Sequence, residues 1–490
     1  MKNYEMYIDG QWCTASNNEN IVSINPATEE PWATFSNATA DDVDRAVTAA
    51  NTAFEHGEWR KLSGTQRGQY LKKIADCVRS NPELLGQTET TDTGKLFRET
   101  RWQANNVAGF YDFFAGQADK IKGDVPVTAD NTPLILTMRE PLGVVAAIVP
   151  WNSQLHLAAV KLGPALAAGN TIVLKPSEQA SAAVLEFTRM IEKAGLPSGV
   201  INVVTGGAEC GQALTSHPLV RRISFTGGVE TARKIIPATR NNIARLSLEL
   251  GGKSPVIVFD DANIDSVVNG VIAGIFAATG QSCAAGSRLL LHENIYDIVV
   301  EKLVERAKNI RIGDPMDDNT QMGPLATLRQ RENIERILKQ SVAMGAKILC
   351  GGSRPKAFNK GWYFEPTIVE CVDQSPTVVQ EELFGPVLSV LRFKTESEAL
   401  EMANASRFAF AGGIFTRDIA RAIRFARRVK AGRLWVNTYR VTSAQVPFGG
   451  SKDSGYGRES GLDAINDFTD IKSIFIDTTG EPVADPFVMR

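Results

Sequence analysis

Short apolar runs alternate with amphipathic stretches through the middle of this 490-residue chain, and this alternation limits its fold more than any other feature. The runs hold too few polar residues for a sheet with one solvent-exposed face, and the apolar residues of the stretches between them have helical spacing. Strands that are apolar on both sides and separated by helices are typical of a parallel sheet covered by helices on both faces. The first series predicts strands at 144–149, 171–174, 200–204, 222–225 and 255–259, with helices near 155–168, 181–194, 208–215 and 229–239.

A second alternating series follows residue 261 and predicts a second α/β unit. Its strands are expected at 287–292, 346–350, 387–393, 412–415 and 433–436, and its helices near 264–277, 295–309, 328–344 and 418–430. The first 115 residues are interpreted as an irregular segment followed by helices, the first of which begins at a capping box of Thr39 and Asp42. We therefore expect an α/β fold with two open parallel-sheet units.

Two stretches, 121–139 and 471–490, fit neither unit, since both are strand-like and interrupted by proline. We expect them to form a small protruding sheet that pairs with another subunit.

Charge and residue usage exclude several classes of protein. Lys and Arg number 53 and Asp and Glu 55, so the net charge of −2 gives no attraction to nucleic acid or to an anionic membrane. The longest apolar runs are about half as long as a membrane span, and the first residues lack the apolar segment of a secretory signal. The six cysteines lie far apart, and the four histidines lack metal-ligand spacing. We expect a cytoplasmic protein without a metal site.

Cys283 is the candidate nucleophile. It lies among small residues between Gly280 and Gly286. A structural cysteine normally lies inside an apolar strand or helix, whereas glycines on both sides favour a loop whose backbone N–H groups face a ligand. Because histidines are scarce, we expect a carboxylate to serve as its base.

Glu249 is the candidate base, flanked by leucines just before a glycine pair. One interpretation is an exposed residue on a strand edge or a structural partner of Lys253. The other is a carboxylate in an apolar pocket, with a raised pKa that suits it to activate water. A cysteine nucleophile and such a carboxylate together indicate a covalent acyl intermediate that water cleaves.

Polar residues and glycines follow three predicted strands at their carboxyl ends, where open α/β sheets bind ligands. Asn152 follows 144–149 and either caps the next helix or donates its amide to an oxyanion. Lys-Pro-Ser-Glu at 175–178 and Phe-Thr-Gly-Gly at 225–228 supply the acidic residue and the helix N-terminus that a dinucleotide needs. The G-x-G-x-x-G fingerprint is absent, and the glycine-rich stretch at 206–211 is equally consistent with a turn.

Eight blocks in order show that the chain resembles the NAD(P)-dependent aldehyde dehydrogenase superfamily over essentially its whole length, in particular its hydrolytic betaine-aldehyde and aromatic-aldehyde dehydrogenases. The blocks are PWN at 150–152, KLGPALAAGN at 161–170, KPSE at 175–178, SFTGG at 224–228, LELGGKSP at 248–255, GQSCAAGSR at 280–288, EELFGPV at 381–387 and PFGGSKDSGYGRESG at 447–461. The resemblance implies two α/β domains and a small β element that joins chains into dimers or tetramers. It assigns NAD binding to 1–120 and 140–250, catalysis to 251–446, oligomerisation to 121–139 and 471–490, and a return to the cofactor-binding body to 447–470.

The resemblance also implies catalytic roles. Cys283 attacks the aldehyde carbon, and Asn152 holds the oxyanion together with the backbone N–H of Cys283. Glu249 activates the water that releases a carboxylate, and Lys161 is a further catalytic residue. The partners implied are a small-molecule aldehyde and other copies of the chain.

For the cofactor, the resemblance places Lys175 and Glu178 at the adenine ribose and Glu382 and Phe384 at the nicotinamide ribose and ring. The other cofactor-binding residues that it implies are Ile148, Val149, Pro150, Trp151, Ser177, Gly207, Gly211, Phe225, Thr226, Gly227, Gly228, Leu250 and Gly251. A carboxylate near the 2′-hydroxyl repels a 2′-phosphate, so Glu178 predicts NAD rather than NADP. No metal is required.

The expected substrate pocket departs from the narrow aromatic pockets of many family members. Its residues are Ser153, His156, Val160, Thr442 and Phe448. Three of these positions lack an aromatic that is frequent in the family, so the hypothesis is a wider, more polar mouth for a bulky or oxygen-bearing, ring-containing aldehyde. His156 either contacts polar groups of the substrate with Arg440 or packs in the core. Ala278 replaces a common Asn, and the sequence offers no explanation.

Three alternatives remain open. A CoA-acylating dehydrogenase shares the nucleophile but generally lacks the water-activating carboxylate, so Glu249 argues against it. A cofactor-free cysteine esterase or amidase has no need of Lys175, Glu178 and Glu382. An inactive structural relative is expected to lack Cys283 or Glu249, and both are present.

Overall fold

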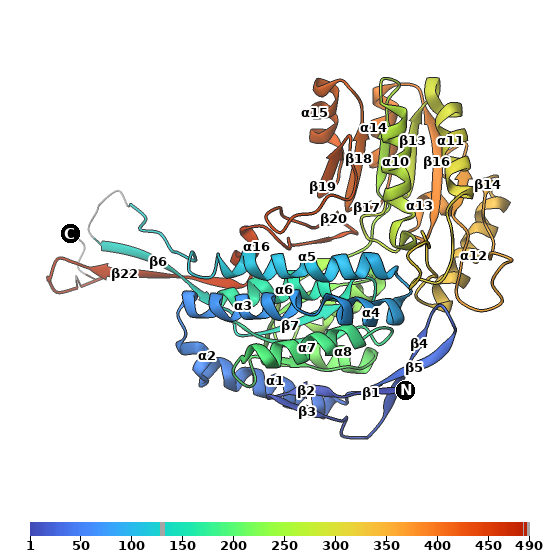
Figure 1. Cartoon of the computed structure of the whole chain (residues 1–490). Coiled ribbons are helices and arrows are strands. Elements are labelled where there is room, and N and C mark those ends of the chain that lie inside the picture. The colour runs from blue at the N-terminus through green and yellow to red at the C-terminus, as the bar shows by residue number, and fades with distance from the viewer. Residues whose placement is uncertain (128–132, 484, 488–490) are drawn as a thin grey trace.

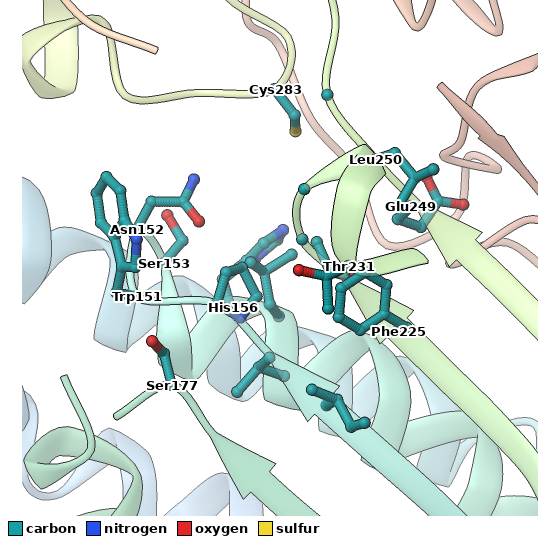
Figure 2. A pocket seen from close by; sticks show the side chains of 18 of the residues that line it. Trp151, Asn152, Ser153, His156, Ser177, Phe225, Thr231, Glu249, Leu250 and Cys283 are labelled. Atoms are coloured by element: carbon teal, nitrogen blue, oxygen red, sulfur yellow. The ribbon is translucent and has the colours of Figure 1, made fainter. Parts of the chain in front are cut away.

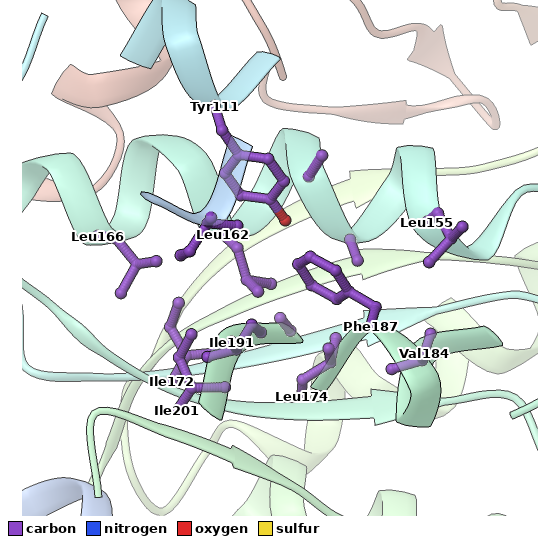
Figure 3. Close-up of a cluster of buried hydrophobic side chains, with 14 of the residues drawn as sticks. Tyr111, Leu155, Leu162, Leu166, Ile172, Leu174, Val184, Phe187, Ile191 and Ile201 are labelled. Atoms are coloured by element: carbon purple, nitrogen blue, oxygen red, sulfur yellow. The ribbon is translucent and has the colours of Figure 1, made fainter. Parts of the chain in front are cut away.

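The computed structural model describes residues 1–127, 133–483 and 485–487 (Figure 1). Strand β7 (Val144–Val149) lies inside an eight-stranded sheet. Its alternate residues enter two different cores. Val145 and Ala147 belong to the core of Figure 3, together with Phe187, whereas Val144 and Ala146 belong to the core on the opposite face. Because both faces are covered, the strand has no position for a polar side chain.

The first sheet has the order β21-β11-β10-β7-β8-β9-β2-β3, and its five strands from β11 to β9 are parallel. Its other strands are β21 (Gly455–Tyr456), β11 (Arg245–Glu249), β10 (Val220–Thr226), β8 (Thr171–Pro176), β9 (Ile201–Val203), β2 (Met6–Ile8) and β3 (Gln11–Cys13). The helices of this body are α1 (Ala40–Glu55), α2 (Glu58–Lys61), α3 (Gly64–Arg79), α4 (Pro82–Thr93), α5 (Phe97–Ala115), α6 (Gln154–Ala168), α7 (Ala182–Ala194), α8 (Ala208–Ser216), α9 (Val229–Ala238) and α16 (Asp463–Asn466).

The second sheet has seven strands in the order β14-β15-β16-β13-β12-β18-β19, all parallel except β14. The strands are β14 (Lys347–Cys350), β15 (Thr367–Glu370), β16 (Val387–Phe393), β13 (Arg288–His292), β12 (Pro255–Val258), β18 (Ala411–Phe415) and β19 (Arg433–Val436). The α-helices of this body are α10 (Ile264–Ile275), α11 (Tyr296–Lys308), α12 (Leu328–Ala343), α13 (Thr377–Gln380), α14 (Glu396–Asn404) and α15 (Ile419–Arg428), and the 3-10 turns are η1 (Ala277–Gly280) and η2 (Glu293–Ile295). Alternate residues of β12 again enter two cores, as Val256 and Ile257 show.

A two-stranded ribbon projects away from both bodies (Figure 1). It pairs β6 (Pro133–Pro141) with β22 (Thr469–Asp477) in antiparallel register along both strands. The strand prediction for 121–139 and 471–490 therefore holds for these parts, whereas 121–127 and 478–483 are not strands. Residues 128–132, 484 and 488–490 lie outside the described residues.

Two expectations are corrected. The first 36 residues are not irregular, since they contain five short strands: β2, β3, β1 (Lys2–Tyr4), β4 (Asn20–Asn25) and β5 (Glu30–Ser36). The alternation pattern also missed β11 and β15, as well as the two-residue pair of β17 (Phe408–Ala409) with β20 (Ser451–Lys452).

The capping box is confirmed, because the side chains of Thr39 and Asp42 each accept from the other's backbone N–H at the start of α1. Along the described chain, no helix combines the length and apolar character needed to cross a membrane.

Candidate active site

A cavity of about 1810 Å³ opens at the carboxyl ends of β7, β8, β10 and β11 and reaches the loop that carries Cys283. We call one part of the cavity, which follows the ends of β8 and β10 and the first turns of α8 and α9, the long arm. The other part, which is lined by α5, α6 and the loop after β19, is called the chamber. The predicted residues that line it are Cys283, Glu249, Asn152, Ile148, Val149, Pro150, Trp151, Lys175, Ser177, Glu178, Gly207, Gly211, Phe225, Thr226, Gly227, Gly228, Leu250, Gly251, Glu382, Phe384, Ser153, His156, Val160, Thr442 and Phe448. Lys161 is the one predicted site residue that does not line it.

The Cys283 thiol points into this cavity from a loop of the second body (Figure 2). The loop turns at Gly280, which has a φ of +71° and packs so closely on Gly385 that a Cβ would lie 2.1 Å from its carbonyl oxygen. Burial raises the pKa of the Cys283 thiol, and the charges of Glu382 and Glu249 raise it further. The thiol therefore needs a base before it can act as a nucleophile.

Just before this turn, Ala278 and Thr279 both have positive φ, at +52° and +55°. A non-glycine residue pays a steric cost in this conformation, and asparagine tolerates it better than alanine. The Ala278 backbone N–H donates to Glu99 Oε1 at 3.4 Å, which ties the turn to α5. The positive φ of Ala278 thus gives a physical reason why Asn is common at this position in the family that the sequence resembles.

Asn152 follows β7 and is buried beside the cysteine loop (Figure 2). Its side-chain Nδ2 donates to the backbone carbonyl of Gln281 at 3.0 Å. The interpretation of Asn152 as a helix cap is wrong, because Ser153 occupies the N-cap position of α6. One N–H of the amide is thus fixed on the loop, and the second N–H is available to an oxyanion beside Cys283.

Glu249 ends β11 and is 1% exposed, so it is not a surface residue. It is not an ion-pair partner of Lys253 either, because Lys253 Nζ has no hydrogen-bond partner among the described residues. Within the part of the chain that the structure describes, neither carboxyl oxygen of Glu249 has a hydrogen-bond partner. Burial raises the pKa of Glu249 well above its usual value, the nearby Glu459 raises it further, and Lys161 and Arg458 lower it. Room for the carboxyl comes from Gly449, where a Cβ would lie 2.5 Å from Oε1. In Figure 2 the carboxyl is turned away from the Cys283 thiol.

Lys161 lies beneath the cavity in a buried polar cluster. Its Nζ donates to Ser224 Oγ at 3.1 Å and forms an ion pair with Glu459 Oε1. Glu459 also accepts from the Ser224 hydroxyl at 3.1 Å. Sequence reasoning missed Glu459, although it lies in the quoted block at 447–461, because a single carboxylate in a glycine-rich loop gave no sign of its partner.

The long arm of the cavity has the features that a dinucleotide requires. Glycines, Gly207 and Gly228, occupy the N-cap positions of α8 and α9 and provide no side-chain cap, so the first N–H groups of these helices remain available to phosphate. The buried Thr226 Oγ1 has no hydrogen-bond partner among residues 1–127, 133–483 and 485–487, and Glu178 follows β8 at the cavity wall. These donors and the acidic residue fit the phosphates and a ribose of NAD.

Glu382 and Phe384 lie where the arm meets the cysteine loop. Glu382 Oε1 accepts from the Gly252 backbone N–H at 2.9 Å, and burial raises the pKa of Glu382 to about 7. Gly251 lacks a Cβ that would otherwise lie 1.8 Å from Glu382 Oε2. The Phe384 ring meets Trp151 edge to face, with 5.4 Å between centroids.

The chamber beyond Cys283 has a mixed lining. His156 packs edge to face on Phe110 with centroids 4.8 Å apart, and it also lines the cavity, so the structure is compatible with both interpretations of this residue. Burial, followed by the charges of Lys95 and Arg433, lowers the pKa of His156 to about 4. Lys95 forms a buried ion pair with Glu89 at 2.9 Å, and sequence reasoning identified neither Lys95 nor Arg433 as a site residue. His156 is thus a neutral imidazole at neutral pH.

Comparison with known proteins agrees with this site. Residues 12–474 match the model of the aldehyde dehydrogenase family. Over the full length of both chains, the protein is 50% identical to (Z)-2-((N-methylformamido)methylene)-5-hydroxybutyrolactone dehydrogenase of Acinetobacter baylyi. It is 40% identical to betaine aldehyde dehydrogenase of Bacillus subtilis, over 96% of this chain and 97% of that protein. The structure of betaine aldehyde dehydrogenase from Staphylococcus aureus in complex with NAD+ superposes with a TM-score of 0.97 at 38% identity, over 99% and 97% of the two chains.

The chain therefore belongs to the aldehyde dehydrogenase family, and it is an NAD(P)-dependent aldehyde dehydrogenase with the fold of that family. The fold class expected from the sequence is confirmed.

Proposed function

We propose that this enzyme oxidises a bulky or polar, ring-containing aldehyde to its carboxylate, with NAD as hydride acceptor and Cys283 as nucleophile. The observation that carries the proposal is the single cavity lined by the Cys283 thiol, the Asn152 amide, the Glu249 carboxyl and the uncapped starts of α8 and α9. A nucleophile, an oxyanion donor, a base and a phosphate site are the parts that this chemistry needs.

The cofactor is held by residues of the long arm. The N–H groups that begin α8 and α9 bind the pyrophosphate, together with the unpartnered Thr226 hydroxyl. Lys175 and Glu178 take the adenine ribose, and Glu382 takes the nicotinamide ribose. Bound NAD supplies the hydride acceptor for the oxidation.

In the first half of the reaction the Cys283 sulfur forms a bond to the formyl carbon. The thiol must lose its proton before it attacks, because its pKa is raised. The proton passes through cavity water to bulk solvent, and Glu249 assists this transfer without being required for it, so its carboxylate is free for the second half. The carbonyl oxygen becomes an oxyanion that Asn152 and the backbone N–H of Cys283 stabilise. Oxidation of this thiohemiacetal leaves a thioester on Cys283.

In the second half Glu249 removes a proton from water, which adds to the thioester carbon. The carbon–sulfur bond breaks, the carboxylic acid leaves and the thiolate is regenerated. A carboxylate with a raised pKa is a competent base for this step. Lys161 acts as a positioning residue, since its ion pair with Glu459 sets the charge next to Glu249.

NAD is preferred to NADP because the Glu178 carboxylate repels a 2′-phosphate. We expect Glu178→Gln to lower the ratio of kcat/KM with NAD to kcat/KM with NADP. The Gln179→Glu control should leave this ratio at its wild-type value. A wild-type enzyme that clearly prefers NADP would overturn this assignment.

The substrate class rests on the lining of the chamber. Ser153, Val160 and Thr442 leave space where bulky aromatic side chains would narrow it. The 50% identical relative acts, by its name, on a compound with a lactone ring. We expect bulky aromatic or heterocyclic aldehydes to outperform acetaldehyde in kcat/KM at fixed NAD, and the reverse order would contradict the substrate class.

NADH formation separates this function from its alternatives. The enzyme should form NADH and free carboxylate from an aldehyde in the absence of CoA. A strict need for CoA with an acyl-CoA product would favour an acylating dehydrogenase, and ester hydrolysis without aldehyde oxidation would favour an esterase.

We further propose that residues 1–120 and 140–250, with 447–470, form the cofactor-binding unit and that 251–446 form the catalytic unit. The β6–β22 ribbon, within 121–139 and 471–490, is proposed to join chains into a dimer or tetramer. It exposes Leu134, Met138, Ile471 and Phe475, which supports a contact with another copy. We expect light scattering to show an oligomer that Phe475→Asp weakens, and a wild-type monomer would contradict the assignment.

A further inference from the structure

Arg433 is a cation at the substrate end of the cavity with no assigned role. It begins β19, opposite Ala411 of β18, and lines the chamber with Phe448. Its guanidinium carbon lies 4.6 Å from the centre of the Phe448 ring and 5.9 Å from that of Trp435. These rings hold the guanidinium group in place by cation–π contact.

The positive charge of Arg433 is uncompensated. Among the described residues it forms no ion pair with a carboxylate, and its buried Nη1 has no hydrogen-bond partner. Its Nη2 has only two long contacts, to the carbonyls of Val446 at 3.5 Å and Pro447 at 3.4 Å. By contrast, Lys95 is paired with Glu89, and Arg440 Nη1 donates to the Ala277 carbonyl at 3.0 Å. A buried donor without a partner is costly, so its retention calls for a partner that the folded chain does not supply.

The field of Arg433 acts where the aldehyde reacts. Its charge interacts with the Cys283 thiol and the Glu249 carboxyl, and it contributes to the lowered pKa of His156. His156, which is neutral at neutral pH, does not cancel this charge, and within the described residues neither carboxyl oxygen of Glu249 pairs with Arg433. A substrate in the chamber therefore meets the field of an unpaired guanidinium group that lines the same cavity as the reacting thiol.

We propose that Arg433 is a specificity-determining residue that selects aldehydes carrying a carboxylate as their second functional group. The inference rests on the proposed function and sharpens its substrate class. A planar guanidinium group binds a carboxylate through two parallel hydrogen bonds. Arg433 lines the chamber and its buried Nη1 has no partner among the described residues, so a small turn of the side chain toward the chamber would satisfy this donor on a substrate carboxylate. The same charge repels a quaternary ammonium group, for which this chamber also lacks an aromatic cage at Ser153, Val160 and Thr442.

The test compares aldehydes of one shape and different charge. With saturating NAD, kcat/KM is measured for meta- and para-carboxybenzaldehyde, their methyl esters and the para-trimethylammonio analogue. Hydrogen bonds between charged partners imply that wild-type enzyme prefers at least one carboxylate over its ester by about 10–100-fold and uses the cationic analogue worst. Arg433→Gln should abolish this preference, and Arg433→Lys should restore part of it.

Arg440→Gln is the matched control, since it removes a second cavity-lining guanidinium group that already has carbonyl partners. The carboxylate preference should survive in this variant. An equal fall of Arg433→Gln toward all substrates would overturn the inference, because it would assign Arg433 to packing on Phe448 or to Glu249. Loss of the preference in Arg440→Gln instead would also overturn it.

The wild-type enzyme alone keeps the inference falsifiable if Arg433→Gln does not fold. Oxidation of the esters without preference for either carboxylate refutes the role of Arg433 and leaves the proposed function intact. Absence of NADH with every aldehyde refutes the proposed function, and this inference falls with it.

Discussion

The side-chain amide of Asn152 donates a 3.0 Å hydrogen bond to the backbone carbonyl of Gln281, two residues before Cys283. Asn152 follows a strand of the first sheet, and Gln281 belongs to the loop that leads into the second. This bond holds the amide and the cysteine loop in one arrangement before an aldehyde arrives, which is the preorganisation that oxyanion stabilisation requires.

Removal of this amide should slow the chemical step. We expect Asn152→Ala to lower kcat by roughly 10²–10³-fold, the usual cost of losing one oxyanion donor, with little change in NAD binding. Steady-state kinetics and a fluorescence titration with NAD measure the two quantities. Gln154→Ala, at a buried amide two residues on, is the control for local disruption. A variant with near wild-type kcat would show that Asn152 only supports the loop.

Replacement of Glu249 should stop the reaction after the first half. Because the base must be ionised and its pKa is raised by burial, we expect wild-type kcat to increase with pH over a range that lies above the usual pKa of a glutamate. Glu249→Gln should form NADH in a burst close to one equivalent per active site and then turn over slowly, without this increase. Rapid-mixing absorbance measures the burst. A slow variant with no burst would assign Glu249 to the first half alone.

Lys161 should act through the ionisation of Glu249 and not through contact with substrate. Its charge lowers the pKa of Glu249, so Lys161→Met should move the rise of kcat to higher pH. The variant also leaves the buried Glu459 without its ion-pair partner, and removal of one partner of a buried pair lowers the free energy of unfolding by about 3–5 kcal/mol. The double variant Lys161→Met/Glu459→Gln should recover part of the loss in thermal midpoint. An unshifted pH profile in Lys161→Met would leave Lys161 with a purely structural role.

Ala278 should be a site where the protein can be stabilised. Its φ of +52° costs alanine about 1 kcal/mol, and part of this is relieved by asparagine. We expect Ala278→Asn to raise the thermal midpoint by roughly 1–2 °C and Ala278→Val to lower it. Differential scanning fluorimetry is sufficient. If Asn lowers the midpoint, the strain at this turn is not what distinguishes the two residues.

The parallel sheets were predictable because both faces of their strands are buried. The run at 144–149 matches β7 residue for residue, and 387–393 matches β16. Short strands such as β4 and β5 carry no such signal, because exposed and partly exposed residues interrupt their buried positions.

Some residues of the candidate site could be predicted from the sequence, and others could not. Residues at the ends of apolar strands, such as Asn152 and Glu249, are marked by their position, and the structure brings them to one cavity. Glu459 and Arg433 were not recognisable, because their importance lies in partners and in a missing partner that are distant in sequence. The left-handed turn at Ala278 was likewise hidden, since alanine gives no indication of positive φ.

The most direct test of the account is the mass of Glu249→Gln enzyme quenched in acid during the NADH burst with a bulky aldehyde. Intact-mass spectrometry and peptide mapping should find one acyl group per chain, attached to Cys283, and none when NAD is omitted or Cys283 is replaced by Ala. NADH formation with no adduct on Cys283, or undiminished oxidation by Cys283→Ala, would contradict it.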